Sequence, residues 1–461
     1  MATVNHFQVA VRCQPSSEEK AWRVQNDCIE LPRTESDENT DTPQLSFAFD
    51  RVLTEEYSHA QFYETVIAPS VQRLIKGGTS NVAILTYGLP CTGKTHTVFG
   101  TPGQTRVKPE ARGVIMRCGE QLFRELGEAT DTTSRVVATF CHLFESEEGR
   151  KSRVADLFDM KKRDLELTED TSTLQFSIPD LTEQSVTSPQ DILGLVEKGY
   201  LMRNATGCVK EPVRNLKPAM KNSMSQPLQQ YRPHNSHAIF TLKCERLRKG
   251  QNEVLTSQII VVDLAGKGIE QIHSGEITCS DSGIKVLHSI LNALSESSPS
   301  TAAVNALFPQ SCLTKLIKPS LGGNCDTILI GNICLKECAV DLSSKCLQVL
   351  SESRKIKNST RVVTIPLDQS ALGKCLQESE KARAEIMQPL GIEMLGKRIE
   401  IIGDKEIKID DSMYEDVSSS VLSSAKQVIT IESQLIQDGE PMQKSTNRYT
   451  VSLLIKHAVS S

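Results

Sequence analysis

The chain carries Gly88-Leu89-Pro90-Cys91-Thr92-Gly93-Lys94-Thr95, an uninterrupted match to the phosphate-loop pattern G-x-x-x-x-G-K-[ST]. The mostly apolar run 81–87 precedes it and predicts a buried strand, so the pattern has the strand–loop–helix context that it requires. Glycines allow backbone N–H groups to turn toward a phosphate, and the N-terminus of the following helix adds partial positive charge. The segment therefore predicts a nucleotide-binding site; the alternative is a chance match in a helix-capping loop.

Each residue of this pattern has an expected role. Lys94 would reach the β- and γ-phosphates of a nucleotide, and the hydroxyl of Thr95 would be a ligand of Mg²⁺. Pro90 has no N–H, so it must lie where the loop needs no donor. The remaining residues would surround the phosphates with backbone: Gly88, Leu89, Cys91, Thr92 and Gly93.

A second segment with the character of a phosphate sensor is 258–266, Q-I-I-V-V-D-L-A-G, an apolar strand that ends in D-x-x-G. In P-loop proteins such a strand lies beside the P-loop strand, with the Asp near Mg²⁺ and the Gly N–H able to sense the γ-phosphate. Asp263 and Gly266 hold these positions. The alternative is that Asp263 only caps the turn after the strand.

Bulk composition is that of an ordinary globular protein, with 461 residues of which 38% are hydrophobic and 24% charged. A formal net charge of −5 argues against a protein that coats nucleic acid. The fourteen cysteines contain no C-x-x-C pair, and no long apolar stretch or secretory signal is present. We therefore expect a soluble protein of the cytoplasm, with no nucleic-acid partner and no membrane insertion.

Hydrophobic periodicity predicts an alternation of strands and helices along most of the chain. The predicted strands are 7–12, 46–49, 81–87, 135–144, 237–247, 258–263 and 327–333. The predicted helices are 60–76, 189–200 and 284–294. Residues 204–235 are polar and contain four prolines, at positions 212, 218, 227 and 233, which predicts an extended insertion.

The sequence after about residue 360 has a different character. Residues 398–402 and 406–409 flank Gly403-Asp404-Lys405, which predicts a short hairpin, and 418–436 is weakly helical. Sustained a/d heptads are absent, so we expect no long dimerising coiled coil.

Several motifs, in family order, resemble those of the kinesin motor domain family. Residues 12–15 resemble the family's R-x-R-P, and 87–98 resemble Y-G-Q-T-G-S/A-G-K-T. Residues 233–242 resemble S-S-R-S-H-x-I-F-T-I, and 263–268 resemble D-L-A-G-S-E. Residues 311–324 resemble S-K-L-T…S-L-G-G-N. The resemblance covers about residues 5–358. It implies an α/β P-loop NTPase fold of the kinesin motor type, with a central, mostly parallel sheet and helices on both faces. Residues 1–358 would form the motor domain and 359–461 a small α+β or partly disordered tail.

The resemblance also implies a site and a function. Arg12 and Pro15 would flank the adenine of ATP with His96 nearby, and Thr95 and Asp263 would hold Mg²⁺. Ser236, Asp263 and Gly266 would be the catalytic set, from the segments called switch I and switch II. The implied activity is that of a microtubule motor ATPase on the cytoskeleton, with tubulin as partner; the cargo or adaptor is not specified.

The chain departs from the family at the hydrolytic machinery. The family's switch I Arg pairs with a switch II Glu, and here these positions are Asn235 and Gly268. The loss of both residues avoids an unpaired charge but should weaken orientation of the attacking water. Glu270 is an alternative partner two residues further on. The family's Mg²⁺-holding serine aligns with His234, a poor ligand for that ion, and Ser236 could replace it.

The expected microtubule face is also depleted of positive charge. Tubulin is acidic, so the family presents Lys and Arg there. Between 267 and 320 the basic residues Lys267, Lys285, Lys315 and Lys318 are balanced by Glu270, Glu276, Asp281 and Glu296. Cys312 replaces the lysine of S-K-L-T. Lys315 and Lys318 are either remaining tubulin contacts or an ordinary solvated helix face.

These observations favour a divergent kinesin-like protein that binds Mg-ATP and hydrolyses it slowly for microtubule-based movement. The alternative is a motor-like scaffold or nucleotide-gated adaptor without motility. A small GTPase would need a guanine-specific N-K-x-D motif, which the sequence lacks.

Overall fold

The computed structural model describes most of the chain. The described residues are 6–15, 22–31, 45–101, 108–145, 152–159, 161–170, 175–207, 236–266, 269–271, 277–279, 281–335, 340–387, 392–402, 406–409 and 448–457. They fall into two compact units, of which the first comprises Met1–Ala129, Arg135–Cys244 and Leu255–Thr364. The second comprises Thr130–Ser134, Glu245–Val254 and Ile365–Ser461.

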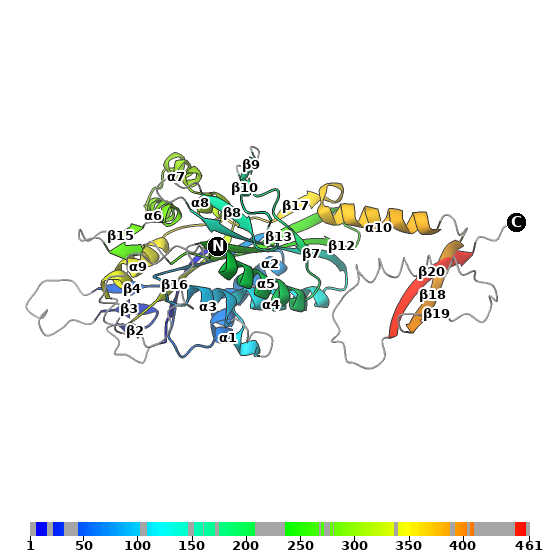
Figure 1. Cartoon of the computed structure of the whole chain (residues 1–461), viewed down its shortest axis with the longest axis horizontal. Helices are drawn as coiled ribbons and strands as arrows, with labels where there is room; N and C mark the ends of the chain where they lie inside the picture. Colours follow the sequence, from blue (N-terminus) through cyan, green and yellow to red (C-terminus); the bar gives the residue numbers. More distant parts are fainter. Residues whose placement is uncertain are drawn as a thin grey trace, which may run out of the picture. The chain divides into compact units, whose positions relative to one another are not determined.

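A mixed β-sheet forms the centre of the first unit (Figure 1), and its main path has the order β11-β7-β12-β13-β6-β16-β1-β5. The pairs β13–β6, β6–β16, β16–β1 and β1–β5 are parallel, whereas β11 and β8 pair with β7 antiparallel. The strands are β1 Phe7–Cys13, β5 Arg51–Leu53, β6 Asn81–Tyr87, β7 Thr132–Phe144, β8 Arg153–Asp156, β11 Gln184–Ser185, β12 His237–Arg248, β13 Glu253–Asp263, β16 Asp326–Ile333 and β17 Val363–Pro366.

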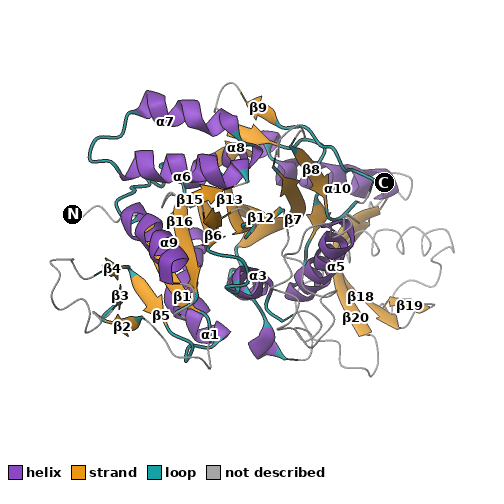
Figure 2. Ribbon diagram, turned by 60° about the vertical axis from the view of Figure 1, so that its left-hand side comes forward, coloured by secondary structure: helices purple, strands orange, loops and turns teal. Residues whose placement is uncertain are grey.

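Both faces of this sheet are buried under helices, so its central strands are apolar on both sides. On β6, Ala83, Leu85 and Tyr87 join one hydrophobic core, whereas Val82 and Ile84 join the other. Helices α6–α9 contribute to the first core and α1–α5 to the second (Figure 2). The helices are α1 His59–Phe62, α2 Ala68–Ile75, α3 Lys94–Phe99, α4 Val114–Glu128, α5 Pro189–Gly207, α6 Ser282–Ser295, α7 Thr301–Leu307, α8 Cys312–Leu316 and α9 Val340–Ser353.

The parallel strands bring their carboxyl ends to one edge of the sheet, where ligands bind in open α/β folds. β6 runs into the loop 88–93, and its neighbours β13 and β16 end at Asp263 and Ile333. β1 ends at Cys13, one strand further along. The predicted phosphate loop and the D-x-x-G segment therefore lie side by side.

Most predicted elements of this unit are confirmed, with corrections at their ends. Strand 81–87 matches β6, and the predicted helix 60–76 is α1 and α2 joined by a π-helical turn at Tyr63–Ile67. The predicted insertion at 204–235 begins too early, because α5 continues to Gly207; residues 208–235 lie outside the described residues. The short strand at 46–49 belongs to a small separate sheet rather than to the main sheet.

Short sheets accompany the main one. They consist of β2 Arg23–Gln25, β3 Cys28–Glu30 and β4 Ser46–Ala48; of β9 Thr168–Asp170 and β10 Gln175–Ser177; and of β14 Ile269–Gln271 and β15 Ile277–Cys279.

The second unit contains α10 Ala371–Met387 and a sheet in which β18 lies between β19 and β20. The strands are β18 Ile392–Ile402, β19 Glu406–Ile409 and β20 Arg448–His457. The predicted hairpin is confirmed by the antiparallel pairing of β18 with β19, whereas the weakly helical stretch 418–436 lies outside the described residues. The division into a motor domain at 1–358 and a tail at 359–461 stays a prediction.

No helix in the described part of the chain has the length and apolar character needed to cross a bilayer.

A buried asparagine near the end of the first unit generates a prediction about stability. The amide nitrogen of Asn358 donates to the carbonyls of Ser320 (3.0 Å) and Cys325 (2.9 Å), and its oxygen accepts from the Gly322 N–H at 2.8 Å. Asn358→Asp would place a carboxylate oxygen against the carbonyls of Ser320 and Cys325, and the Thr327 hydroxyl near it already donates to the Ser320 carbonyl. We expect a loss of about 3 kcal/mol in the free energy of unfolding, measured by urea denaturation. Asn252→Asp, at an exposed turn, is the matched control, and equal midpoints would contradict the prediction.

Candidate nucleotide-binding site

The loop between β6 and α3 has a backbone shape that only particular residues allow. Gly88 has φ 144° and Gly93 has φ 93°, both in the region that favours glycine. A Cβ added to Gly88 would lie 2.2 Å from the carbonyl oxygen of Asn332 at the end of β16. Cys91 adopts φ 61° and is exposed. The loop is therefore held in a fixed curve against the sheet edge, as phosphate binding by backbone N–H groups requires.

Lys94 begins α3 and points back into this loop. Its side chain is buried, and Nζ donates to the carbonyls of Gly88 (2.8 Å) and Leu89 (2.6 Å). Burial lowers the pKa of Lys94 to about 8. Thr92 closes the loop by donating from its hydroxyl to the Leu89 carbonyl at 2.8 Å. The ammonium group is thus held among carbonyl dipoles that phosphate oxygens could replace.

The residues predicted to hold Mg²⁺ are in direct contact. Thr95 Oγ1 donates to Asp263 Oδ2 at 2.8 Å, and Asp263 is buried at the end of β13. Gly266 lies against the same loop, because a Cβ there would be 2.8 Å from Lys94 Nζ and 3.0 Å from Pro90 Cα. A hydroxyl and a carboxylate are the oxygen ligands that Mg²⁺ prefers. The donor set therefore fits a Mg²⁺ ion shared with a nucleotide.

Arg203 is a site residue that the sequence analysis missed. It lies on α5 with its side chain 1% exposed, and Nη1 donates to Asp263 Oδ2 at 2.5 Å. Nη2 donates to the backbone carbonyl of Ser236 at 2.6 Å. Arg203 therefore ties Ser236, the predicted switch I serine immediately before β12, to the end of β13. No sequence motif marks it, since a single arginine in a helix is unremarkable before its partner is known.

The residues predicted to surround the base gather at the end of β1 and the start of α3. Arg12 Nη1 donates to Thr97 Oγ1 at 2.9 Å, and its guanidinium lies 5.1 Å from the Phe62 ring centre. The imidazole of His96 is exposed beside His59, with ring centres 4.4 Å apart. Pro15 is exposed in the segment after β1.

Two histidines connect this edge of the sheet to α6. His237 accepts from the Ala265 N–H at 3.0 Å through Nδ1, and its Nε2 lies 3.3 Å from Asp281. Burial alone would raise the pKa of Asp281, but hydrogen bonds from His237 and from the N–H of Ile284 hold it below its usual value. Asp281 is the N-cap of α6.

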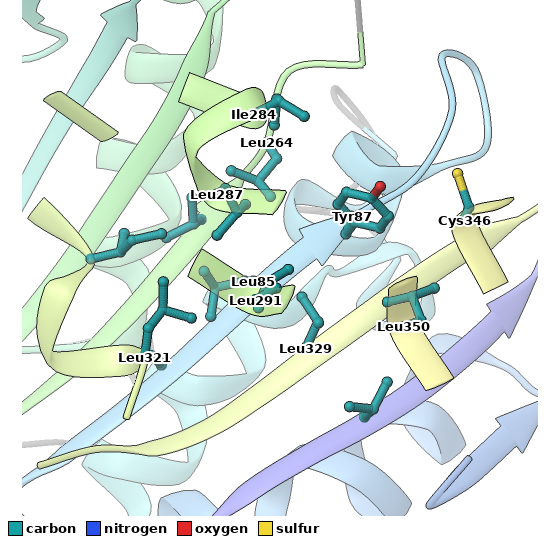
Figure 3. Packing of buried hydrophobic residues seen from close by; sticks show 14 of the residues in the cluster. Leu85, Tyr87, Leu264, Ile284, Leu287, Leu291, Leu321, Leu329, Cys346 and Leu350 are labelled. Carbon is teal, nitrogen blue, oxygen red and sulfur yellow. The ribbon is translucent and has the colours of Figure 1, made fainter. Parts of the chain in front are cut away.

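The second connection reaches the middle of α6. The hydroxyl of Tyr87, the last residue of β6, lies 2.6 Å from His288 Nε2. Tyr87 packs with Leu287 and Leu291 of α6 in the same hydrophobic core (Figure 3). Burial lowers the pKa of His288 to about 4, so at neutral pH the imidazole is uncharged. The end of β6, which leads into the phosphate loop, therefore shares a hydrogen bond and a packed interface with α6.

Glu145, also missed from the sequence, anchors α8 and the start of α6. Its carboxylate is buried and accepts from Ser311 Oγ at 2.8 Å and from the Leu313 N–H at 2.7 Å. Ser282 Oγ lies 3.5 Å from its other oxygen. A single carboxylate thus connects the helix that resembles S-K-L-T to the end of β7.

Several positions named from the sequence lie outside the described residues: His234, Asn235, Lys267, Gly268 and Glu276. Glu270 lies on β14, whose side chains are not described. On the predicted microtubule face, Lys315 Nζ lies 5.6 Å from the Phe176 ring centre and Lys318 Nζ lies 5.8 Å from that of Phe308.

The fold and this geometry define a class of protein. A phosphate loop follows the central parallel strand, and an Asp-Leu-Ala-Gly segment follows its neighbour, with Lys94, Thr95 and Asp263 converging between them. This is the architecture of a P-loop NTPase. The sequence model of the kinesin motor domain matches residues 11–215 and 216–356, and the chain belongs to this family.

Known proteins that resemble the chain support the same assignment. Kinesin-like protein KIN-7O of Arabidopsis thaliana is 26% identical over 401 residues, covering 83% of this chain and 28% of that protein. The chromosome-associated kinesin KIF4 of Xenopus laevis is 26% identical over 369 residues, covering 78% of this chain and 28% of that protein. A solved structure of a fast kinesin aligns with a TM-score of 0.63 at 23% identity, covering 79% of this chain and 96% of that one. The chain spans little more than a quarter of the length of the Arabidopsis and Xenopus relatives.

From the buried ion pair between Arg203 and Asp263 we predict the effect of removing the arginine. Arg203→Met would leave the Asp263 carboxylate buried without a cation, with the hydroxyls of Thr95 (2.8 Å) and Thr86 (3.5 Å) as its side-chain donors. We expect a loss of about 3–5 kcal/mol in the free energy of unfolding, measured by urea denaturation. The double variant Arg203→Met with Asp263→Asn removes both charges and should recover most of the loss. A single variant as stable as the unsubstituted protein would show that the pair is not a structural requirement.

His288 predicts a dependence of stability on pH. Its pKa is about 4 in the folded protein and about 6.5 when unfolded, so the unfolded chain binds the proton first. Stability should therefore fall as the pH decreases from about 6.5 to about 4, by at most about 3 kcal/mol from this group. His288→Gln keeps an acceptor for the Tyr87 hydroxyl but cannot titrate. Urea denaturation across this pH range should give a flatter profile for the variant, and parallel profiles would contradict the assignment.

Proposed function

We propose that this chain is a kinesin-type motor ATPase that binds Mg-ATP at the loop 88–95, associates weakly with microtubules and hydrolyses ATP slowly. The observation that carries the proposal is the convergence of Lys94, Thr95 and Asp263 at the carboxyl edge of the sheet, with Thr95 Oγ1 2.8 Å from Asp263 Oδ2. The match to the kinesin motor domain and the fast kinesin structure, which was described with an ATPase mechanism and microtubule interactions, supports it.

The binding residues have distinct tasks in this proposal. Backbone N–H groups of the loop would hold the phosphates, and Lys94 would exchange its contacts with the Gly88 and Leu89 carbonyls for phosphate oxygens. Thr95 and Asp263 would hold Mg²⁺, which when bound supplies positive charge to the β- and γ-phosphate oxygens. Gly266, close to Lys94 Nζ, would sense the γ-phosphate through its N–H.

Slow hydrolysis follows from the sequence at the two switch positions. Asn235 and Gly268 replace the family's Arg and Glu, so no salt bridge can form between them to close the site around the attacking water. Arg203 supplies a different connection between the two segments through Ser236 and Asp263. All three residues are buried, so we do not expect this connection to orient a water molecule.

Weak association with microtubules follows from charge. The balanced charges between 267 and 320 give little attraction to an acidic surface. Lys315 and Lys318 each lie near an aromatic ring, a contact worth about 0.5–1 kcal/mol at exposed sites. A microtubule partner would place the protein in the cytoplasm on the cytoskeleton.

A nucleotide-gated adaptor without motility is the second candidate. It is favoured by the loss of both switch residues in a chain that retains its phosphate loop. In that case nucleotide binding alone would change the position of α6 through the contacts of Tyr87 and His237.

Steady-state ATP turnover with and without polymerised microtubules tests the proposal. We expect detectable ATP binding and slow turnover, and an increase of about tenfold or more for Asn235→Arg combined with Gly268→Glu, because the pair would again orient the attacking water. Lys94→Ala, which removes the phosphate contact, should abolish both binding and turnover.

Other outcomes separate the two candidates. Vigorous microtubule-stimulated turnover by the unsubstituted chain would refute slow hydrolysis. Tight ATP binding with no turnover, and no gain in the double variant, would favour the adaptor. A chain that binds no nucleotide at all would refute both.

A further inference from the structure

A pair of histidines lies at the edge of the site, and the sequence motifs explain only one of them. His96 follows Thr95 in α3, whereas His59 is the first residue of α1, 37 residues earlier. The two rings meet edge to face, with an interplanar angle of 66°, and His59 Nε2 lies 3.2 Å from His96 Nδ1. His59 thus packs against the imidazole of His96, which the resemblance to kinesin motor domains places near the adenine base.

The position of His59 is fixed by the structure of α1. Ser58 caps the helix by accepting from the Gln61 N–H at 3.2 Å, and the Gln61 side chain accepts from the Ser58 N–H at 3.0 Å. This capping box fixes where the helix starts. Phe62, fully buried one turn further on, lies beneath the Arg12 guanidinium. His59 and Arg12 are therefore held in one arrangement.

Hydrogen bonding then determines which nitrogen carries each proton. Arg12 can only donate, and its Nη1 lies 3.4 Å from His59 Nδ1, so that nitrogen is the acceptor and Nε2 carries the proton. His59 Nε2–H can then donate to His96 Nδ1, which leaves the His96 proton on Nε2, 3.2 Å from Thr101 Oγ1. Burial, followed by the charge of Arg12, lowers the pKa of His59 to about 3. A directed chain of donors thus holds the exposed His96 ring as a neutral surface.

We propose that His59 is a specificity-determining positioning residue, which orients His96 so that the aromatic base of the bound nucleotide packs against it. The inference rests on the proposed function and deepens it, because it assigns base recognition to a residue outside the kinesin-like motifs. An oriented aromatic ring gains more from stacking with a base than a freely rotating one. The phosphate contacts of Lys94 and Thr95 come from other residues, so they do not depend on His59.

The test compares a ligand that has a base with one that lacks it. ADP and inorganic tripolyphosphate, each with Mg²⁺, are titrated against the full chain by displacement of a fluorescent ADP analogue. His59→Ala should weaken ADP binding about fivefold and leave tripolyphosphate binding unchanged, since only ADP uses the His96 ring. His59→Gln retains one acceptor and one donor and should restore most of the ADP affinity. Glu56→Ala, at an exposed position three residues earlier, is the control and should change neither.

The outcomes are distinguishable. An equal loss for both ligands in His59→Ala would mean that His59 supports only the fold of the loop and would overturn the proposal. Unchanged ADP affinity, or failure of His59→Gln to restore it, would also overturn it. If the unsubstituted chain binds neither ADP nor tripolyphosphate, the proposed function itself fails.

Discussion

The buried carboxylate of Asp263 is the constraint on which the rest of the site depends. A charge at a position only 1% exposed is costly unless it is paired and hydrogen-bonded, and here Thr95 and Arg203 meet that need on the same oxygen. These two contacts fix the start of α3 and the end part of α5 relative to β13. Arg203 extends the constraint to the Ser236 carbonyl, so the start of β12 is fixed as well. The geometry of the phosphate loop is thus set by electrostatics beneath it as much as by its glycines.

The same edge of the sheet is joined to α6 at two separate points. His237 joins the Ala265 N–H to the N-cap Asp281, and Tyr87 joins the end of β6 to His288. The apolar surface between these points is continuous, so a shift of α6 would alter packing along its length. A ligand that displaced the end of β6 or the Ala265 N–H would therefore disturb these contacts with α6, and by linkage a partner that displaced α6 would change the affinity for that ligand. This reciprocity does not depend on the rate of hydrolysis.

The sequence patterns correctly predicted the elements that are specified by residues close together in the chain. The phosphate loop, the strand 81–87 and the hairpin at 398–409 depend on neighbouring residues, and each lies where its pattern placed it. The contacts that it could not predict join distant residues: Arg203 is 60 positions from Asp263 and Tyr87 is 201 from His288. An arginine or a histidine inside a helix has no local signature of burial. The continuation of α5 to Gly207 was missed for a related reason, since polar composition indicates exposure but not the end of a helix.

Nucleotide binding and hydrolysis make different demands on this site. Binding requires a preformed loop, a buried ammonium and oxygen ligands, and these are held by contacts that are complete within the described residues. Hydrolysis requires in addition that the switch segments close over the phosphates and orient water. On the proposed function, Asn235 and Gly268 affect that closing step, and because the cation and the anion of the family's pair are both missing, neither charge is left unpaired. On the proposed function, nucleotide binding would therefore still be transmitted to α6 through Tyr87 and His237. The chain would, however, be slow to end that nucleotide-bound state by hydrolysis.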